Sequence, residues 1–205
     1  MKNILPKALS ELIDDFGVLP GVGARTAERY AYYMLRNETA LCRRLAGSLE
    51  KLHAHVGTCP VTFAFIDANE DVSPLYSAAD RDKTVVAVVE DPFDVLAVEN
   101  TGQFSGTYHV LGGAISPIDG VGPEQLHIPE LIERIKKDKV KEIILATNAS
   151  VEGESTALYI QKQIENAGLE NIAITRLARG LPSGVDLAYT DQITLSHALK
   201  GRQNL

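Results

Sequence analysis

The alternation of apolar runs with amphipathic segments beyond residue 83 is the feature that most constrains this fold. Short, near-continuous apolar stretches recur at 84–90, 107–113, 142–147 and 171–177, and segments with helical spacing of apolar residues separate them. Strands of this kind, joined by amphipathic helices, are typical of a mostly parallel sheet covered by helices on both faces. We therefore predict an α/β domain over residues 84–180.

Two polar residues fall where such a sheet binds its ligands. Ligands of open α/β sheets lie at the carboxyl ends of the strands. Glu90 ends the stretch TVVAVVE, and Asn148 directly follows the stretch EIILAT. Both side chains are therefore predicted at the same edge of the sheet.

The stretch ATNASVEGESTA, residues 146–157, resembles the metal-binding sequence of the Toprim group of topoisomerases and bacterial primases. Those two-metal enzymes have a Thr-Asp-x-Asp-x-x-Gly-Glu type of sequence after a buried strand, and Glu90 matches their glutamate. Here the two aspartate positions are Asn148 and Ser150. Neutral groups attract a divalent cation far less than paired carboxylates do, so no metal site and no catalysis are expected.

Two carboxylates near this edge allow a second interpretation. Glu152 and Glu154 stand at the start of a predicted helix, where acidic side chains stabilise the helix dipole by roughly 0.3–1 kcal/mol each. The favoured interpretation is this helix-start role. In the alternative, an altered metal set of Glu90, Glu152 and Glu154 makes the chain a Toprim-type nuclease or nucleotidyl transferase.

The first 55 residues predict a small helical unit. Helical spacing of apolar residues marks two helices, carried by Leu9, Leu12, Ile13, Phe16, then Ala27, Tyr30, Ala31, Met34. A third helix is predicted from about residue 39 to 53. Between the first two, Gly21 and Gly23 permit a tight turn that directs backbone N–H groups outward, where a phosphate can bind.

The turn and its neighbours resemble a helix-hairpin-helix, an element that binds DNA without sequence specificity. Arg25 and Arg29 add positive charge beside the turn. Residues 1–55 hold eight Lys or Arg against six acids, a net charge of +2, and the rest of the chain holds twelve against twenty-one, a net charge of −9. Any contact with a phosphate backbone is therefore expected from the amino-terminal part.

Residues 56–83 predict a small irregular lobe with one short strand. The chain has no apolar run long enough to span a membrane and no signal-peptide pattern, so we expect no membrane association and a cytoplasmic location. Its two cysteines, Cys42 and Cys59, are too few for a disulfide framework.

Four blocks of the sequence together resemble the RecR family of bacterial recombination mediators: residues 19–35, 88–126, 142–160 and 178–202. The resemblance implies a helix-hairpin-helix over 1–55, a Toprim fold without known catalysis and a carboxyl-terminal segment, 181–205, that makes oligomer contacts. It also implies homodimers or ring-like homotetramers that encircle single- or double-stranded DNA. Acting with RecO and RecF, such proteins help load recombinase on single-stranded DNA.

The same resemblance assigns residues to these contacts. Glu90 and Asp94 match acids tied to RecO contact. Lys7, Arg25 and Arg29, with the turn glycines Gly21 and Gly23, are the candidates for DNA contact.

The lobe departs from the family pattern, which places four zinc-binding cysteines there. The corresponding positions are Cys59, Thr62, Ser73 and Tyr76, so one ligand of four remains and we expect no zinc. A rearranged site with His53, His55 and Cys59 is the less favoured alternative. Apolar side chains are expected to stabilise the lobe in place of the metal: Val61, Phe63, Phe65, Leu75, Tyr76.

Overall fold

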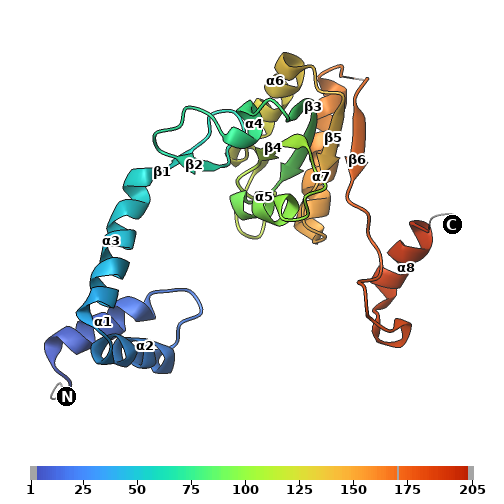
Figure 1. The fold of residues 1–205 in the computed structure, drawn as a ribbon. Helices are drawn as coiled ribbons and strands as arrows, with labels where there is room; N and C mark the ends of the chain where they lie inside the picture. Colours follow the sequence, from blue (N-terminus) through green and yellow to red (C-terminus); the bar gives the residue numbers. More distant parts are fainter. Residues whose placement is uncertain (1–3, 170, 203–205) are drawn as a thin grey trace. The chain divides into compact units, whose positions relative to one another are not determined.

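The chain divides into two compact units, Met1–Val56 and Gly57–Leu205 (Figure 1). A computed structural model describes residues 4–169 and 171–202. The first unit is helical. It consists of α1 (Lys7–Gly17), α2 (Ala24–Arg36) and α3 (Thr39–His55).

Helices α1 and α2 pack against each other and form the core of the first unit. Ala27 and Ala31 of α2 are buried, and the rings of Phe16 and Tyr30 meet edge to face with centroids 5.8 Å apart. Small residues at i and i+4 let the two helices approach closely, as the apolar spacing predicted. The three helices predicted from the sequence are confirmed.

The second unit begins with a small lobe and continues as alternating strands and helices. In chain order its elements are β1 (Val56–Thr58), β2 (Phe65–Asp67), α4 (Pro74–Ser77), β3 (Asp82–Val89), α5 (Pro92–Glu99), β4 (Gly106–Val110), η1 (Pro123–Gln125), α6 (Ile128–Asp138), β5 (Glu142–Leu145), α7 (Val151–Asn166), β6 (Ala173–Arg176), η2 (Leu187–Tyr189) and α8 (Gln192–Lys200).

The main sheet has four strands in the order β4-β3-β5-β6, and every neighbouring pair is parallel. In its register Val86 lies opposite Ile143, which in turn lies opposite Ile174. The predicted α/β architecture with a parallel sheet is confirmed. Because β3 and β5 are neighbours, the residues that follow them meet at one edge.

Alternating residues of β3 face the two layers of helices. Val86 and Val88 belong to the core beneath α6 and α7, whereas Ala87 and Val89 pack toward α5 and the lobe. This alternation follows from the two-residue period of a strand. Both faces of the sheet are therefore covered, which explains the near-continuous apolar sequence of the strand.

The lobe is held to α6 and to His127, the residue before that helix, by polar as well as apolar contacts. It contains a two-stranded sheet, β1-β2, where the sequence predicted one strand. The Tyr76 hydroxyl donates to Asp138 at 3.0 Å, and Asp138 pairs with the buried Arg134 at 3.1 Å. Phe63, at a φ of 59°, stacks on His127 with centroids 3.7 Å apart.

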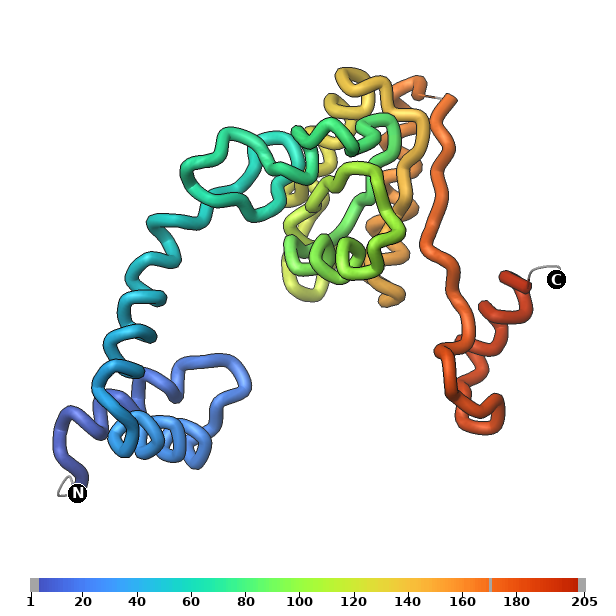
Figure 2. The backbone as a smooth tube through the Cα atoms, in the orientation of Figure 1, coloured from blue at the N-terminus to red at the C-terminus, as the bar shows by residue number. Residues whose placement is uncertain are grey.

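After β6 the backbone runs without regular structure to η2 and then turns into α8 (Figure 2). Asp191 caps α8 by accepting from the backbone N–H groups of Ile193 and Thr194. Within the described residues, no helix has both the length and the apolar character needed to cross a lipid bilayer.

Candidate functional site

Glu90 and Asn148 meet at the carboxyl edge of the sheet, as predicted from the order of strands and turns. The backbone N–H of Asn148 donates to one carboxylate oxygen of Glu90 at 2.9 Å, and its side-chain amide donates to the other at 2.6 Å. Glu90 is 8% exposed. Both oxygens that a metal ion would use are thus engaged by one asparagine, and we call this arrangement the Glu90–Asn148 pair.

Ser150 and Gly153 complete the turn into α7. Ser150 is the N-cap of this helix, and its hydroxyl accepts from the backbone N–H of Gly153 at 3.0 Å. A β-carbon on Gly153 would clash with the Asn148 carbonyl and approach a Glu90 carboxylate oxygen to 2.8 Å. The turn therefore fits tightly around the Glu90–Asn148 pair, and Ser150 has a structural role where an enzyme would have an aspartate.

Glu152 and Glu154 both lie in the first turn of α7, as the helix-start interpretation predicted. Glu154 also has a role that the sequence did not reveal. Its carboxylate pairs with Arg176, the last residue of β6, at 2.6 Å, and with Arg179, which follows that strand. Charge-assisted bonds of this kind hold Glu154 away from a metal-binding role.

No group of three His, Cys, Asp or Glu side chains is arranged to hold a metal ion within residues 4–169 and 171–202. The alternative sets considered from the sequence are Glu90 with Glu152 and Glu154, and the histidines 53 and 55 with Cys59. Neither forms such a group.

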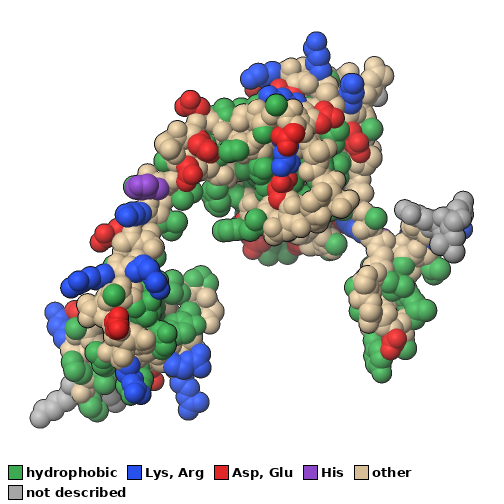
Figure 3. All heavy atoms as spheres, viewed as in Figure 1, with side chains coloured by type: hydrophobic (Ala, Val, Ile, Leu, Met, Phe, Trp, Pro, Cys, Tyr) green, Lys and Arg blue, Asp and Glu red, His purple; other side chains and the backbone are tan. Residues whose placement is uncertain are grey.

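The turn between α1 and α2 has the features of a phosphate-binding site. Gly21 has a φ of 77°, which a residue with a β-carbon rarely adopts. Gly23 is the N-cap of α2, and no side chain caps the free N–H groups of the first turn. Arg25 and Arg29 are exposed, and Lys7, 87% exposed, pairs with Glu11 at 3.4 Å. Figure 3 shows Lys and Arg side chains on this unit.

Asp94 lies in the first turn of α5, four residues after Glu90 in the sequence. Its carboxylate accepts from the backbone N–H of Asp91 at 2.9 Å, while Asp91 accepts from that of Phe93 at 2.8 Å. This capping box fixes the first turn of α5. The carboxylate of Asp94 is partly buried, and that of Asp91 is exposed.

Three of the four degenerate zinc positions lie together in the lobe. The Cys59 sulfur accepts from the backbone N–H groups of Thr62 at 3.4 Å and Ser73 at 3.3 Å. Cys59, Thr62 and Ser73 are all buried. The fourth position, Tyr76, donates its hydroxyl to Asp138. We call Cys59, Thr62 and Ser73 the lobe knot.

This donor set does not fit a structural zinc site. Burial raises the pKa of the Cys59 thiol, but hydrogen bonds from the Thr62 hydroxyl and the neighbouring N–H groups outweigh burial and lower it overall. One thiol with two hydroxyls and an engaged phenol lacks the soft, tetrahedral ligands that zinc requires. Hydrogen bonds occupy the positions at which the family pattern has zinc ligands.

The expectation that apolar side chains take the place of zinc is correct only in part. Phe63 and Leu75 pack against the core beneath the lobe, but Phe65 is 53% exposed. The lobe knot, together with Tyr76 and Asp138, supplies polar contacts that the sequence pattern did not indicate.

Comparisons with known proteins show the family to which the chain belongs. Three sequence models of protein families match the chain. The RecR helix-hairpin-helix family matches residues 9–53, the Toprim domain family matches residues 84–178, and the RecR carboxyl-terminal family matches residues 180–203. A Recombination protein RecR from Moorella thermoacetica is 46% identical over 200 residues, which cover 98% of each chain. The chain belongs to the RecR family.

Other RecR proteins are similar over the same extent. That of Herpetosiphon aurantiacus is 43% identical over 203 residues, which cover 99% of this chain and 97% of its own. That of Thermobifida fusca is 46% identical over 198 residues, which cover 97% of each. All three carry the name of a recombination protein, and a role in DNA recombination and repair is the function that the RecR family supports.

Sequence reasoning missed several residues of this edge. Gly153 is needed for its lack of a side chain, and Arg176 and Arg179 are needed to pair with Glu154. The phrase Val-Glu-Gly-Glu reads as an ordinary helix start, so nothing in it marks the glycine as a close contact. The two arginines lie more than twenty residues beyond their partner, and only the strand order brings them together.

Proposed function

We propose that the chain is a non-catalytic DNA-binding clamp and adaptor in recombinational DNA repair, acting with RecO and RecF to help load recombinase on single-stranded DNA. The Glu90–Asn148 pair carries this proposal. In a Toprim enzyme a carboxylate at this edge holds a divalent cation. Here both oxygens of Glu90 accept hydrogen bonds from Asn148, so the edge is stable without an ion.

DNA contact through the α1–α2 turn is the second part of the proposal. The uncapped N–H groups of α2 and the exposed Arg25 and Arg29 support binding to a phosphate backbone. Lys7, Gly21 and Gly23 belong to the same contact. Binding of this kind reads no bases, so it suits both single- and double-stranded DNA.

A salt titration tests the DNA contact. We expect the affinity for a fluorescent oligonucleotide to fall steeply with salt concentration and to fall further in Arg25→Glu. The slope of log affinity against log salt should drop by roughly one for each lost phosphate contact. Lys162→Glu makes the same charge change on an exposed residue of α7 and should leave the slope unchanged. An equal loss in both variants would reject the hairpin as the contact.

The partner contact is proposed at Glu90 and Asp94. Glu90 is buried against Asn148, so its part is to fix the strand end, whereas the start of α5 presents acidic groups at the surface. RecO and RecF are proposed as partners on the family resemblance.

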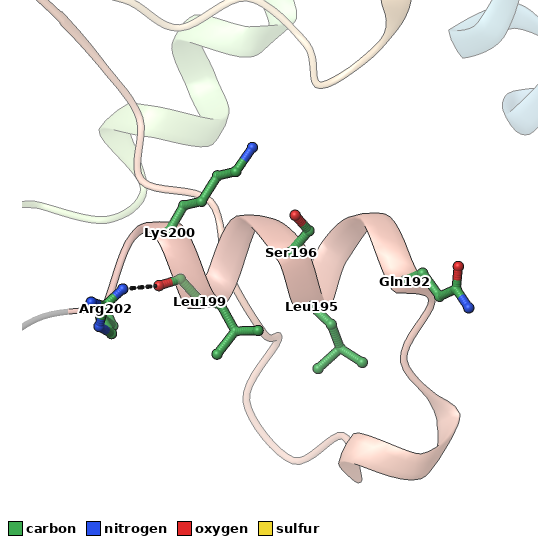
Figure 4. A pocket seen from close by; sticks show the side chains of 6 residues that line it. All are labelled: Gln192, Leu195, Ser196, Leu199, Lys200 and Arg202. Carbon is green, nitrogen blue, oxygen red and sulfur yellow. Dashed lines mark hydrogen bonds between the residues drawn. The ribbon is translucent and has the colours of Figure 1, made fainter.

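Assembly into a homodimer or homotetramer is proposed to involve residues 181–205. Leu195 and Leu199 project from one side of α8, and Ser196 and Lys200 project from the other (Figure 4). Several apolar side chains of this segment are strongly exposed: Leu187, Tyr189, Ile193, Leu199. Exposed apolar side chains gathered in one short segment support contact with a second chain.

Two further points complete the proposal. We propose that the lobe holds together without zinc, a proposal that the hydrogen bonds of the lobe knot support. The cytoplasm, where bacterial DNA lies, is the compartment that this function requires. The competing enzyme function needs Glu90, Glu152 and Glu154 to hold a metal. Nicking of supercoiled plasmid in Mg²⁺ or Mn²⁺, lost in Glu90→Gln, would establish that function instead.

A further inference from the structure

Two exposed phenylalanines from separate elements of the second unit meet at its surface. Phe65 of β2 is 53% exposed, Phe93 of α5 is 70% exposed, and their ring centroids lie 5.9 Å apart at an angle of 73°. Leu96, 59% exposed, lies one helical turn after Phe93 and so on the same face of α5. We call Phe65, Phe93 and Leu96 the aromatic patch. Figure 3 shows hydrophobic side chains over α5.

The local structure fixes the backbone that carries the aromatic patch. Phe93 donates its backbone N–H to Asp91 within the capping box, and Pro92 occupies the first helical position. Phe65 stands on a paired strand, with its neighbour Ile66 turned toward the interior. Rings that are already fixed lose little conformational entropy when a partner covers them. The patch therefore has the preorganisation of an interface anchor.

The surroundings of the aromatic patch are acidic. No Lys or Arg occurs between Lys83 and Arg134, and Asp91 and Asp94 flank Phe93 at the start of α5, whereas Glu99 at the end of that helix is paired with Arg81. No Lys or Arg occurs between Lys51 and Arg81 either, a stretch that contains Asp67. Asp67 lies on the same face of β2 as Phe65, because residues i and i+2 of a strand point the same way. Such a surface repels nucleic acid and anionic lipid and attracts a basic protein surface.

We infer that the aromatic patch anchors a partner protein whose contact surface carries aliphatic side chains between lysines or arginines. The apolar side chains of the partner cover the two rings, and its basic groups meet Asp67, Asp91 and Asp94. The inference rests on the proposed function, because it concerns the partner contact at the start of α5. It adds an apolar centre to that contact and makes the lobe, through Phe65, part of it.

Aromatic side chains at the centre of an interface, surrounded by polar groups, contribute most of its binding energy. The acidic groups chiefly set the rate and specificity of association. The two kinds of residue therefore predict different experimental signatures. Loss of a ring should weaken binding at any salt concentration, whereas reversal of an acid should weaken it most at low salt.

The test measures binding of purified RecO from the same organism by calorimetry, at low and at moderate salt. Phe93→Ala and Phe65→Ala should each weaken binding by about tenfold or more at both salt concentrations. The matched control is Leu158→Ala, which removes an equally exposed apolar side chain, 64% exposed, from α7. It should bind RecO as the wild type does.

Charge reversal forms the second arm. Among the described residues Asp67 accepts a hydrogen bond through its backbone carbonyl, from the Glu70 N–H, and none through its side chain, so Asp67→Lys changes charge without removing a structural contact. It should weaken RecO binding at low salt and reduce the salt dependence. Glu133→Lys, on the exposed side of α6, is the control and should have no effect.

Each result decides a separate point. Wild-type affinity in both phenylalanine variants would overturn the inference and leave the proposed function standing. Failure of the wild-type protein to bind RecO would overturn both. If Phe93→Ala instead lowers the mass of the chain in solution, the patch contacts a second copy and the inference is wrong. Unfolding midpoints equal to that of the wild type confirm that each variant is folded.

Discussion

Asn148 determines what the carboxyl edge of the sheet can do. An aspartate at this position would place two negative charges against each other and require a cation between them, whereas the amide supplies donors that satisfy Glu90 directly. With a nitrogen in place of one oxygen, the Asn148 side chain donates to Glu90 where an aspartate would repel it. Ser150 follows the same logic, because its hydroxyl caps α7.

The variant Asn148→Asp tests this view of the edge. We expect it to lower the free energy of unfolding by about 1–3 kcal/mol at neutral pH, because the amide that donates to the buried Glu90 carboxylate is replaced by a like charge. Mg²⁺ should restore part of that loss by binding the folded state only. Thermal unfolding with and without Mg²⁺ measures both effects. Asn148→Ala, which adds no charge, should lose stability without responding to Mg²⁺, and a response there would contradict the explanation.

His109 provides a pH-dependent term in stability. It is fully buried on β4, its Nε2 lies 2.7 Å from the His127 carbonyl oxygen, and burial lowers its pKa to about 3. In the unfolded chain the pKa is about 6.5, so the unfolded state binds more protons between these values and is favoured by acid. Stability contributed by neutral His109 is therefore present above pH 6.5 and is lost as the pH falls.

We expect the wild-type unfolding free energy to decrease between pH 6.5 and pH 4.5 by up to about 1.4 kcal/mol per pH unit on account of His109. Acidic groups with lowered pKa values, such as Glu99, act mainly below this window. Denaturant unfolding across the window measures the slope. His109→Gln should flatten it, and an unchanged slope in that variant would show that other groups are responsible.

At the scale of elements, most of the fold could be predicted and most of the site could not. Apolar runs and helical spacing identified the four strands of the sheet and the helices between them, since burial on both faces leaves a direct trace in composition. The edge position of Glu90 and Asn148 followed from their places at the carboxyl ends of two predicted strands. The pairing of Glu154 with Arg176 did not, because it depends on the register of β5 against β6.

The lobe was the least predictable element. Its sequence indicates a metal site that has lost three ligands, with apolar side chains in their place. In the structure, backbone N–H groups turn toward the Cys59 sulfur, Ser73 caps α4, and Tyr76 reaches Asp138. Backbone donors carry no side-chain signal, so no residue pattern could indicate this arrangement. The one retained cysteine is explained by its role as the acceptor in the lobe knot.

Metal analysis tests the account of the lobe. The purified protein should contain no stoichiometric zinc, and a chelator should not change its unfolding midpoint, because hydrogen bonds hold the lobe knot. Zinc near one equivalent per chain would contradict this. The triple variant Thr62→Cys, Ser73→Cys, Tyr76→Cys should gain about one zinc per chain, since residues 62 and 73 already lie against Cys59, and its stability should become sensitive to chelator.

At the scale of the whole molecule, the amino-terminal part and the rest of the chain carry net charges of opposite sign. The first 55 residues carry a net charge of +2, and the remainder carries −9. A basic unit suited to DNA is thus joined to an acidic unit suited to basic proteins, and this division fits a protein that brings a partner to DNA. The carboxyl-terminal segment adds a third surface, the apolar side of α8.

If the apolar side of α8 contributes to assembly, a charge placed there should lower the mass of the protein in solution. Leu199→Lys places a charge on the exposed apolar side of α8 and should shift the protein toward smaller assemblies in light scattering. Leu158→Lys places the same charge on a similarly exposed leucine of α7, 64% exposed, and serves as the control. Equal masses for the two variants would show that α8 does not contribute to assembly.

The most direct measurement for the central claim is a calorimetric titration of the wild-type protein with Mn²⁺, with Glu90→Gln run alongside. If Asn148 satisfies the Glu90 carboxylate, both proteins give the same weak, non-stoichiometric heats. Stoichiometric Mn²⁺ binding by the wild type that disappears in Glu90→Gln would contradict the claim and indicate a working metal site.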